Sequence, residues 1–172
     1  MKWVSLFIAT VLISVSQIPT IQLKESSRVG GIEFTPLSVE LRKINLRRPV
    51  WTSDQVFQSD DSYTVLTYRL TNVTEEQAID PSVLQGVMED QFGNAHQQVA
   101  GYQICPNCII NEPTQARELL PGNSQNLIAV FQAPKITKAE LFTIKVSFVK
   151  DNKNQRGEVW LLLKRSDIGK AN

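Results

Sequence analysis

Cys105 and Cys108, in the sequence Cys-Pro-Asn-Cys, carry the most specific chemistry in this chain. A structural zinc site needs four ligands, and the chain offers only these two cysteines and one histidine, His96. Haem attachment needs a histidine directly after the second cysteine, where Ile109 stands. A catalytic dithiol needs its first cysteine at a helix N-terminus, whereas the flanking residues 102–104 have the pattern of a strand. We expect a local disulfide between Cys105 and Cys108, and keep thiol–disulfide exchange as the alternative.

Other candidate groups for catalysis or metal binding stand apart from one another. His96 is a lone histidine, and no Gly-x-Ser-x-Gly motif accompanies it. The carboxylate pairs Asp60–Asp61 and Glu75–Glu76 would point to opposite faces of a strand, and the spacing around them and Asp54 is not that of an EF-hand. No glycine-rich phosphate-binding motif is present. We therefore predict no catalytic residue, no metal ligands and no cofactor, with a ligand or metal carrier that uses acidic loop residues as a further alternative.

Charge excludes one class of partner. Eighteen basic and 17 acidic residues give a formal net charge of +1. A nucleic-acid-binding surface normally requires a marked excess of basic residues. We expect no nucleic-acid partner.

An uncharged apolar stretch, Trp3–Ser16, follows Lys2 near the N-terminus. Its length is typical of the apolar region of a signal peptide and is short for a membrane span. Ser14 and Ser16 are small residues placed as a cleavage site requires, before Gln17. We predict that residues 1–16 form an apolar helix that is either a signal peptide or an uncleaved membrane anchor, and that residues 17–28 form a linker.

Alternating strand patterns fill the remaining chain. Tyr63–Val73 is the clearest, because Leu66, Tyr68 and Leu70 share one face. Further strand signals are separated by turn residues, such as Gly93 and the pair Pro121–Gly122. Seven or eight short strands are typical of a sandwich. We predict an all-β, immunoglobulin-like antiparallel sandwich over residues 29–166 and a tail over 167–172.

The turn motifs carry a family resemblance. A strand ends on Asn72 before Val-Thr, Asp90 is followed by Gln-Phe-Gly, Leu120 by Pro-Gly, and Phe131 by Gln-Ala-Pro. Over roughly residues 30–149 this order resembles the DUF4352-type immunoglobulin-like domains of exported bacterial proteins. The resemblance implies an extracytoplasmic binding, adhesion or assembly module with no shared catalytic residues. The chain departs from the family in lacking the lipid-modified cysteine after the apolar stretch and in carrying the Cys-Pro-Asn-Cys sequence.

Three aromatic residues are candidates for contacts or for the core. Trp51 and Phe57 lie in the polar stretch 49–61, which we read as a long loop, and we predict that they contact a partner. Trp160 lies in the apolar run Val159–Leu163, where we expect a core position. Asn72-Val-Thr also fits a glycosylation acceptor, in a host that modifies such sites.

These observations favour a non-catalytic protein-interaction module outside the cytoplasm, such as an accessory subunit of a membrane-associated assembly. The domain is expected in the periplasm, on the cell surface, or anchored to the membrane by the N-terminal segment. The expected partner is an exported or membrane protein. The sequence leaves the partner's identity and the oligomeric state open.

Overall fold

The computed structural model describes residues 18–43, 46–47, 56–57, 62–79, 85–103, 118–132, 138–150 and 155–170. Within them the chain is built almost wholly of strands. The N-terminal apolar helix predicted for residues 1–16 lies outside this part of the chain. The strands are β1 (Thr20–Ile21), β2 (Ser27–Val29), β3 (Ile32–Lys43), β4 (Leu46–Arg47), β5 (Val56–Phe57), β6 (Ser62–Asn72), β7 (Gln85–Asp90), β8 (Ala95–Gln103), β9 (Ser124–Gln132), β10 (Leu141–Lys150), β11 (Gln155–Lys164) and β12 (Ile168–Lys170), with a single-turn 3-10 helix, η4 (Arg165–Asp167), before β12.

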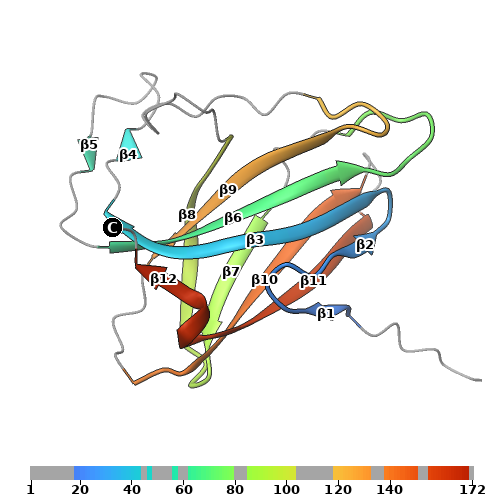
Figure 1. Cartoon of the computed structure of the whole chain (residues 1–172). Coiled ribbons are helices and arrows are strands. Elements are labelled where there is room, and N and C mark those ends of the chain that lie inside the picture. Colours follow the sequence, from blue (N-terminus) through green and yellow to red (C-terminus); the bar gives the residue numbers. More distant parts are fainter. Residues whose placement is uncertain are drawn as a thin grey trace, which may run out of the picture.

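One strand is shared by the two layers of a sandwich (Figure 1). The strand order is β1-β11-β10-β7-β8-β9-β6-β3-β12, and β2 also pairs with β3. The first part of β8 pairs with β7, and its second part pairs with β9 after a register shift between Gln98 and Ala100. A bulge bends a strand and increases its twist, which lets β8 pass from one layer to the other. We call the layer β1-β11-β10-β7 the lower sheet and the layer β9-β6-β3 the upper sheet.

The edges opposite β8 meet each other. Val29 of β2 lies so near Gly157 of β11 that a Cβ atom on the glycine would come within 2.0 Å of the Val29 Cγ1. The chain crosses between the two sheets at residues 22–26, where the Lys24 amide donates to the Pro36 carbonyl at 2.8 Å. The sandwich is therefore closed on one side by β8 and on the other by β1 and β2.

Every second side chain of each strand points between the sheets, and these side chains fill the core. On β6 the predicted inward residues Leu66, Tyr68 and Leu70 are buried in the main apolar cluster, together with Phe142, Ile144 and Val146 of β10. Phe34 and Tyr68 pack as a tilted aromatic pair with ring centroids 5.5 Å apart. The all-β prediction and the two-layer arrangement are confirmed.

The folded part is longer at both ends than predicted. The predicted linker 17–28 contains β1 and most of β2, and Ile21 is buried in the core. The predicted tail 167–172 contains β12, which pairs in parallel with Val39–Leu41 of β3. All three short strands were missed because two or three residues are too few to show an alternating pattern.

Candidate functional site

Most residues that we considered for a chemical role lie outside the part of the chain that the structure describes. Cys105, Cys108 and Trp51 lie outside the part of the chain that the structure describes. Phe57 belongs to β5, where it pairs with Leu46 of β4 rather than standing in an open loop. Asp54 and the pair Asp60–Asp61 also lie outside the described ranges.

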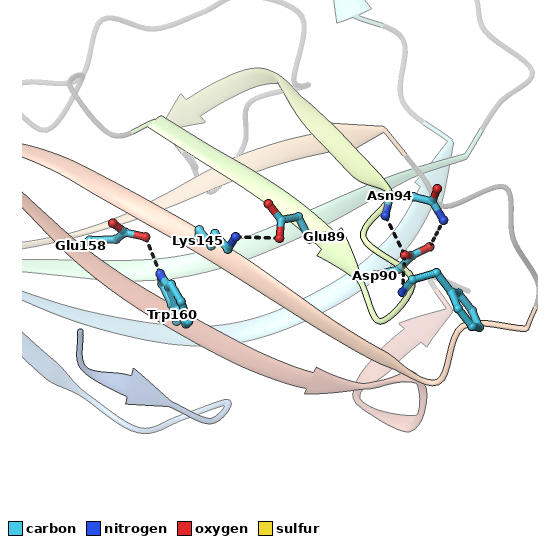
Figure 2. Close-up of polar contacts among 7 residues, drawn as sticks. Glu89, Asp90, Asn94, Lys145, Glu158 and Trp160 are labelled. Atoms are coloured by element: carbon cyan, nitrogen blue, oxygen red, sulfur yellow. Dashed lines mark hydrogen bonds and ion pairs between the residues drawn. The ribbon is translucent and has the colours of Figure 1, made fainter. Parts of the chain in front are cut away.

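Asp90 ends β7 and organises the turn into β8. Its Oδ1 atom accepts hydrogen bonds from the backbone amides of Phe92 and Asn94, both at 2.9 Å, and its Oδ2 atom accepts one from the Asn94 side chain at 2.8 Å. Figure 2 shows the carboxylate and Asn94 facing each other across the turn. Gly93 takes the positive φ of 82° that the turn requires. All these bonds are internal to the turn, so Asp90 serves its structure.

Burial and hydrogen bonding act in opposite directions on Asp90. Desolvation raises the pKa of its carboxyl, while the bonds from Asn94 and Phe92 and the nearby His96 lower it. The lowering effects prevail, and the pKa lies below the ordinary value. Asp90 therefore stays ionised and is not a general acid near neutral pH.

His96 lies on β8 directly opposite Met88 of β7. Its Nε2 atom is buried and makes no hydrogen bond to the described residues. A histidine that serves as a general base needs an open nitrogen within reach of a substrate proton. This position fits a packing role for His96 better than a catalytic one.

Asn72 ends β6 in the same way as Asp90 ends β7. Its side chain is fully buried, and its Nδ2 donates to the carbonyls of Gln77 and Leu119, both at 2.7 Å. Its Oδ1 accepts from the amide and hydroxyl of Thr74 at 2.9 and 2.7 Å. The amide nitrogen that a glycan would modify has both hydrogens engaged, so the folded chain does not offer this acceptor.

Trp160 faces away from the core, contrary to the prediction. Val159, Leu161 and Leu163 of β11 are buried between the sheets, which turns Trp160 and Leu162 to the outer face. The indole nitrogen donates to Glu158, and the Lys145 Nζ lies 5.3 Å from the indole ring centroid and 2.6 Å from the Glu89 Oε2. Figure 2 shows this row of side chains across β11, β10 and β7. Because Val159–Leu163 is apolar throughout, its pattern does not indicate which of its residues face outward.

Large exposed apolar side chains lie on the same face near its end and in the adjoining turn. Phe92 is 59% exposed, Leu141 53% and Leu162 45%. Leu162 pairs with Thr143, so it is the diagonal neighbour of Leu141 on β10. The Gln91 side chain accepts hydrogen bonds from the amides of Glu140 and Leu141, which fixes the Phe92 turn beside β10. We call Phe92, Leu141 and Leu162 the Phe92 patch.

Sequence reasoning missed the Phe92 patch, although part of the signal was visible. Leu141 alternates with Phe142 and shares its face with Thr143 and Lys145, which marks it as the outward residue. Only the strand register shows that Leu162 joins it there.

Among the residues that the structure describes, no three His, Cys, Asp or Glu side chains are grouped as metal ligands. In the same ranges no helix is both long enough and apolar enough to cross a membrane.

Solved structures share this fold. The chain is similar to an uncharacterized β-sandwich protein from Clostridium difficile 630, with a TM-score of 0.58, 13% identity, and 86% of this chain and 95% of that chain covered. It is similar to MPT63, a secreted protein from Mycobacterium tuberculosis, with a TM-score of 0.52, 8% identity, and 87% and 98% covered. The YjhA protein from Bacillus subtilis gives a TM-score of 0.51, 11% identity, and 81% and 98% covered.

At these identities the likeness shows a β-sandwich fold. No family model matches the chain, and no curated protein matches it by sequence. The DUF4352-type resemblance therefore stays an interpretation of the turn motifs.

Proposed function

We propose that this chain is a non-catalytic protein-interaction module that works outside the cytoplasm as an accessory subunit of a membrane-associated assembly. The observation that supports the proposal best is the Phe92 patch. Leu141 and Leu162 are exposed as diagonal neighbours on one sheet face, and Phe92 is exposed in the turn that Gln91 joins to β10. Large exposed apolar side chains are costly in water and gain free energy when a partner covers them.

The surroundings of the patch suit a protein partner. The ion pair between Lys145 and Glu89 and the exposed Glu140 give it a polar rim, and an apolar centre with a polar rim is the usual anatomy of an interface. The half-buried Trp160 lies two residues from Leu162 on β11 and would add an aromatic contact at the margin. The expected partner is an exported or membrane protein.

Polar groups of the described residues support a binding role over a catalytic one. Asn72 and Asp90 are buried polar side chains at strand ends, and both make hydrogen bonds that hold the turns that follow them. Placement outside the cytoplasm rests on the apolar segment Trp3–Ser16 and on the immunoglobulin-like reading of the sandwich. In this proposal the Phe92 patch takes the role of partner contact.

Native size in a detergent extract of the source cells tests the function. We expect the wild-type chain to elute far above the size of a 19.4 kDa protein, and the double variant Leu141→Ser/Leu162→Ser to elute as a small free protein. Leu120→Ser is the matched control, because Leu120 is 54% exposed but lies beside the turn that precedes β9, and not on the lower sheet.

Two results would count against the proposal. Elution of the wild-type chain as a small free protein would remove the assembly role. Equal elution of the Leu120 and Leu141/Leu162 variants would remove the patch as the contact surface. Circular dichroism of each variant checks that the sandwich is intact.

We also propose that Cys105 and Cys108 form a structural disulfide after export. Alkylation of the denatured chain with and without reductant counts the free thiols directly. A bridge with a reduction potential below about −300 mV agrees with a structural role, and a more oxidising value supports thiol–disulfide exchange instead.

A further inference from the structure

The outward side chains of β11 carry opposite charges at the two ends of an apolar centre. Val159, Leu161 and Leu163 are buried in the core, so the residues that alternate with them lie on the outer face of the lower sheet. In chain order these outward residues are Glu158, Trp160, Leu162 and Lys164. The strand therefore presents an acid, two large apolar side chains and a base in one row.

This row is accessible to a partner. Leu162 is 45% exposed, and Lys164 is exposed at the end of the strand. Trp160 and Glu158 are half-buried and lie side by side, with the indole nitrogen donating to the Glu158 carboxylate (Figure 2). Because that hydrogen bond goes to the Oε1 atom, the second carboxylate oxygen can accept one from a cation of a partner.

A row of this kind is complementary to an antiparallel copy of itself. Most homodimers have a two-fold axis, which brings the same surface of both subunits into contact. When such an axis crosses β11 beside Leu161, each outward residue faces the one that lies equally far on the other side of Leu161. Trp160 then faces Leu162 of the second copy, and Glu158 faces Lys164 of the second copy. Both contacts join groups that attract each other.

Strand geometry allows both contacts at once. Glu158 and Lys164 each lie three residues from Leu161, which places each of them about 10 Å from the axis at the usual rise of a strand. Packed sheets cross at about 30°, which displaces the opposed ends sideways by roughly 5 Å. The long side chain of lysine can span that displacement.

The neighbouring strand agrees with this arrangement. Thr143 pairs with Leu162 and Lys145 pairs with Trp160, so the same rotation places Thr143 against Lys145 of the second copy. A hydroxyl oxygen there meets an ammonium group, and no like charges are opposed. Among the side chains that the structure describes on the outer face of β7, β10 and β11, the charged ones are Glu89, Lys145, Glu158 and Lys164. Two acids and two bases leave no net charge to repel a second copy.

We propose that the outer face of the lower sheet joins two copies of this chain about a two-fold axis at β11, with Trp160 against Leu162 and Glu158 against Lys164. This inference rests on the proposed function, because it takes the same face as the interaction surface and names a second copy as the occupant at Leu162. Phe92 lies in the turn after β7, away from β11, and stays available to a further exported partner.

Charge changes in the purified full chain test the pairing. In detergent, size exclusion with light scattering is expected to give the wild type twice the chain mass of 19.4 kDa. Glu158→Lys and Lys164→Glu each set like charges against each other at both ends of the row, and each should weaken the dimer at least about tenfold. Glu118→Lys is the matched control, because it makes the same charge change at an exposed residue before β9 and should leave the dimer intact.

Mixing the two interface variants gives a result that this pairing predicts and a general charge effect does not. One chain then has lysine at both positions and the other has glutamate at both, so every charge again faces its opposite. We expect a heterodimer in the equimolar mixture at a concentration where neither variant dimerises alone. A monomeric wild type, a dimer that neither charge change weakens, or a mixture that stays monomeric would overturn the proposal. Circular dichroism checks that each variant is folded.

These outcomes are separate from those of the proposed function. A monomeric purified chain, together with a large species in the extract that the Leu141/Leu162 variant releases, would overturn the second copy and leave the proposed function in place. A purified dimer that responds to the charge changes as expected, with nothing larger in the extract, would support the pairing and remove the larger assembly.

Discussion

Asn72 and Asp90 each end a strand and hold the turn that follows with a side chain. Asn72 joins Thr74, Gln77 and Leu119, and Asp90 joins Phe92 and Asn94. The motifs that suggested a family are thus hydrogen-bonded turns, which explains why they carry information about the fold and none about chemistry. Short polar side chains are favoured at such positions because they replace missing backbone partners.

Asn72→Ala is expected to lower the free energy of unfolding by about 2–4 kcal/mol, because the buried side chain loses its hydrogen bonds to Leu119, Gln77 and Thr74 together. Urea unfolding measures the change. Asn126→Ala is a suitable control, since Asn126 is exposed on β9, and it should cost less than about 1 kcal/mol. An Asn72 variant as stable as the wild type would contradict the network described above.

Asp90 makes stability depend on pH in acid. Its pKa is lowered in the folded chain, so its contribution is present above the ordinary carboxyl pKa of about 4 and is lost as the pH falls through the lower folded value. We expect Asp90→Asn to be less stable than the wild type at neutral pH and to lose less on acidification below about pH 4. Thermal unfolding at several pH values checks this. If Glu75→Gln changes the pH dependence of stability in the same way, the effect comes from the net charge of the chain rather than from the hydrogen bonds of Asp90.

At the scale of elements, close approach of β2 and β11 depends on a residue without a side chain. Gly157→Ala would place a Cβ 2.0 Å from the Val29 Cγ1, and overpacking of this kind costs about 1–3 kcal/mol. Adding Val29→Ala should restore most of the loss by removing the colliding methyl. Gly169→Ala is the control, because its nearest contacts would be 3.7 Å away. Equal costs for both glycines would reject this account.

Alternation predicted the long strands and their faces well. Tyr63–Val73 was placed within one residue of β6 at each end, because the buried residues Leu66, Tyr68 and Leu70 recur at every second position. Trp160 was misplaced because an apolar run conceals the alternation, and β1, β2 and β12 were missed because pairing rather than pattern defines them. The Phe92 patch could not be predicted, since it depends on which strands lie side by side.

At the scale of the whole molecule, the sandwich begins before the predicted boundary. Ile21 is buried in the core, and the Trp160 amide donates to the Pro19 carbonyl at 3.0 Å. A chain that starts at Gln17, as cleavage after Ser16 would produce, keeps both contacts. A chain that starts at Gln22 should be less stable by about 2–5 kcal/mol, the usual cost of deleting a buried isoleucine side chain. Denaturant unfolding measures the difference in the free energy of unfolding between the two chains. Equal stability would mean that residues 17–21 are a linker and do not stabilise the sandwich.

A strand common to both sheets makes the two long sides of the sandwich unequal. Along β8 the layers are joined covalently, so they cannot separate there without breaking the strand's own pairing. On the opposite side the described residues join the edges through β1, β2, the crossing at Lys24 and the turn η4, which leads from β11 to β12 beside β3. The two sheets should therefore separate transiently at the β1 side more often than along β8. Amide hydrogens near β1, such as that of Trp160, should exchange with solvent before those of the strands beside β8.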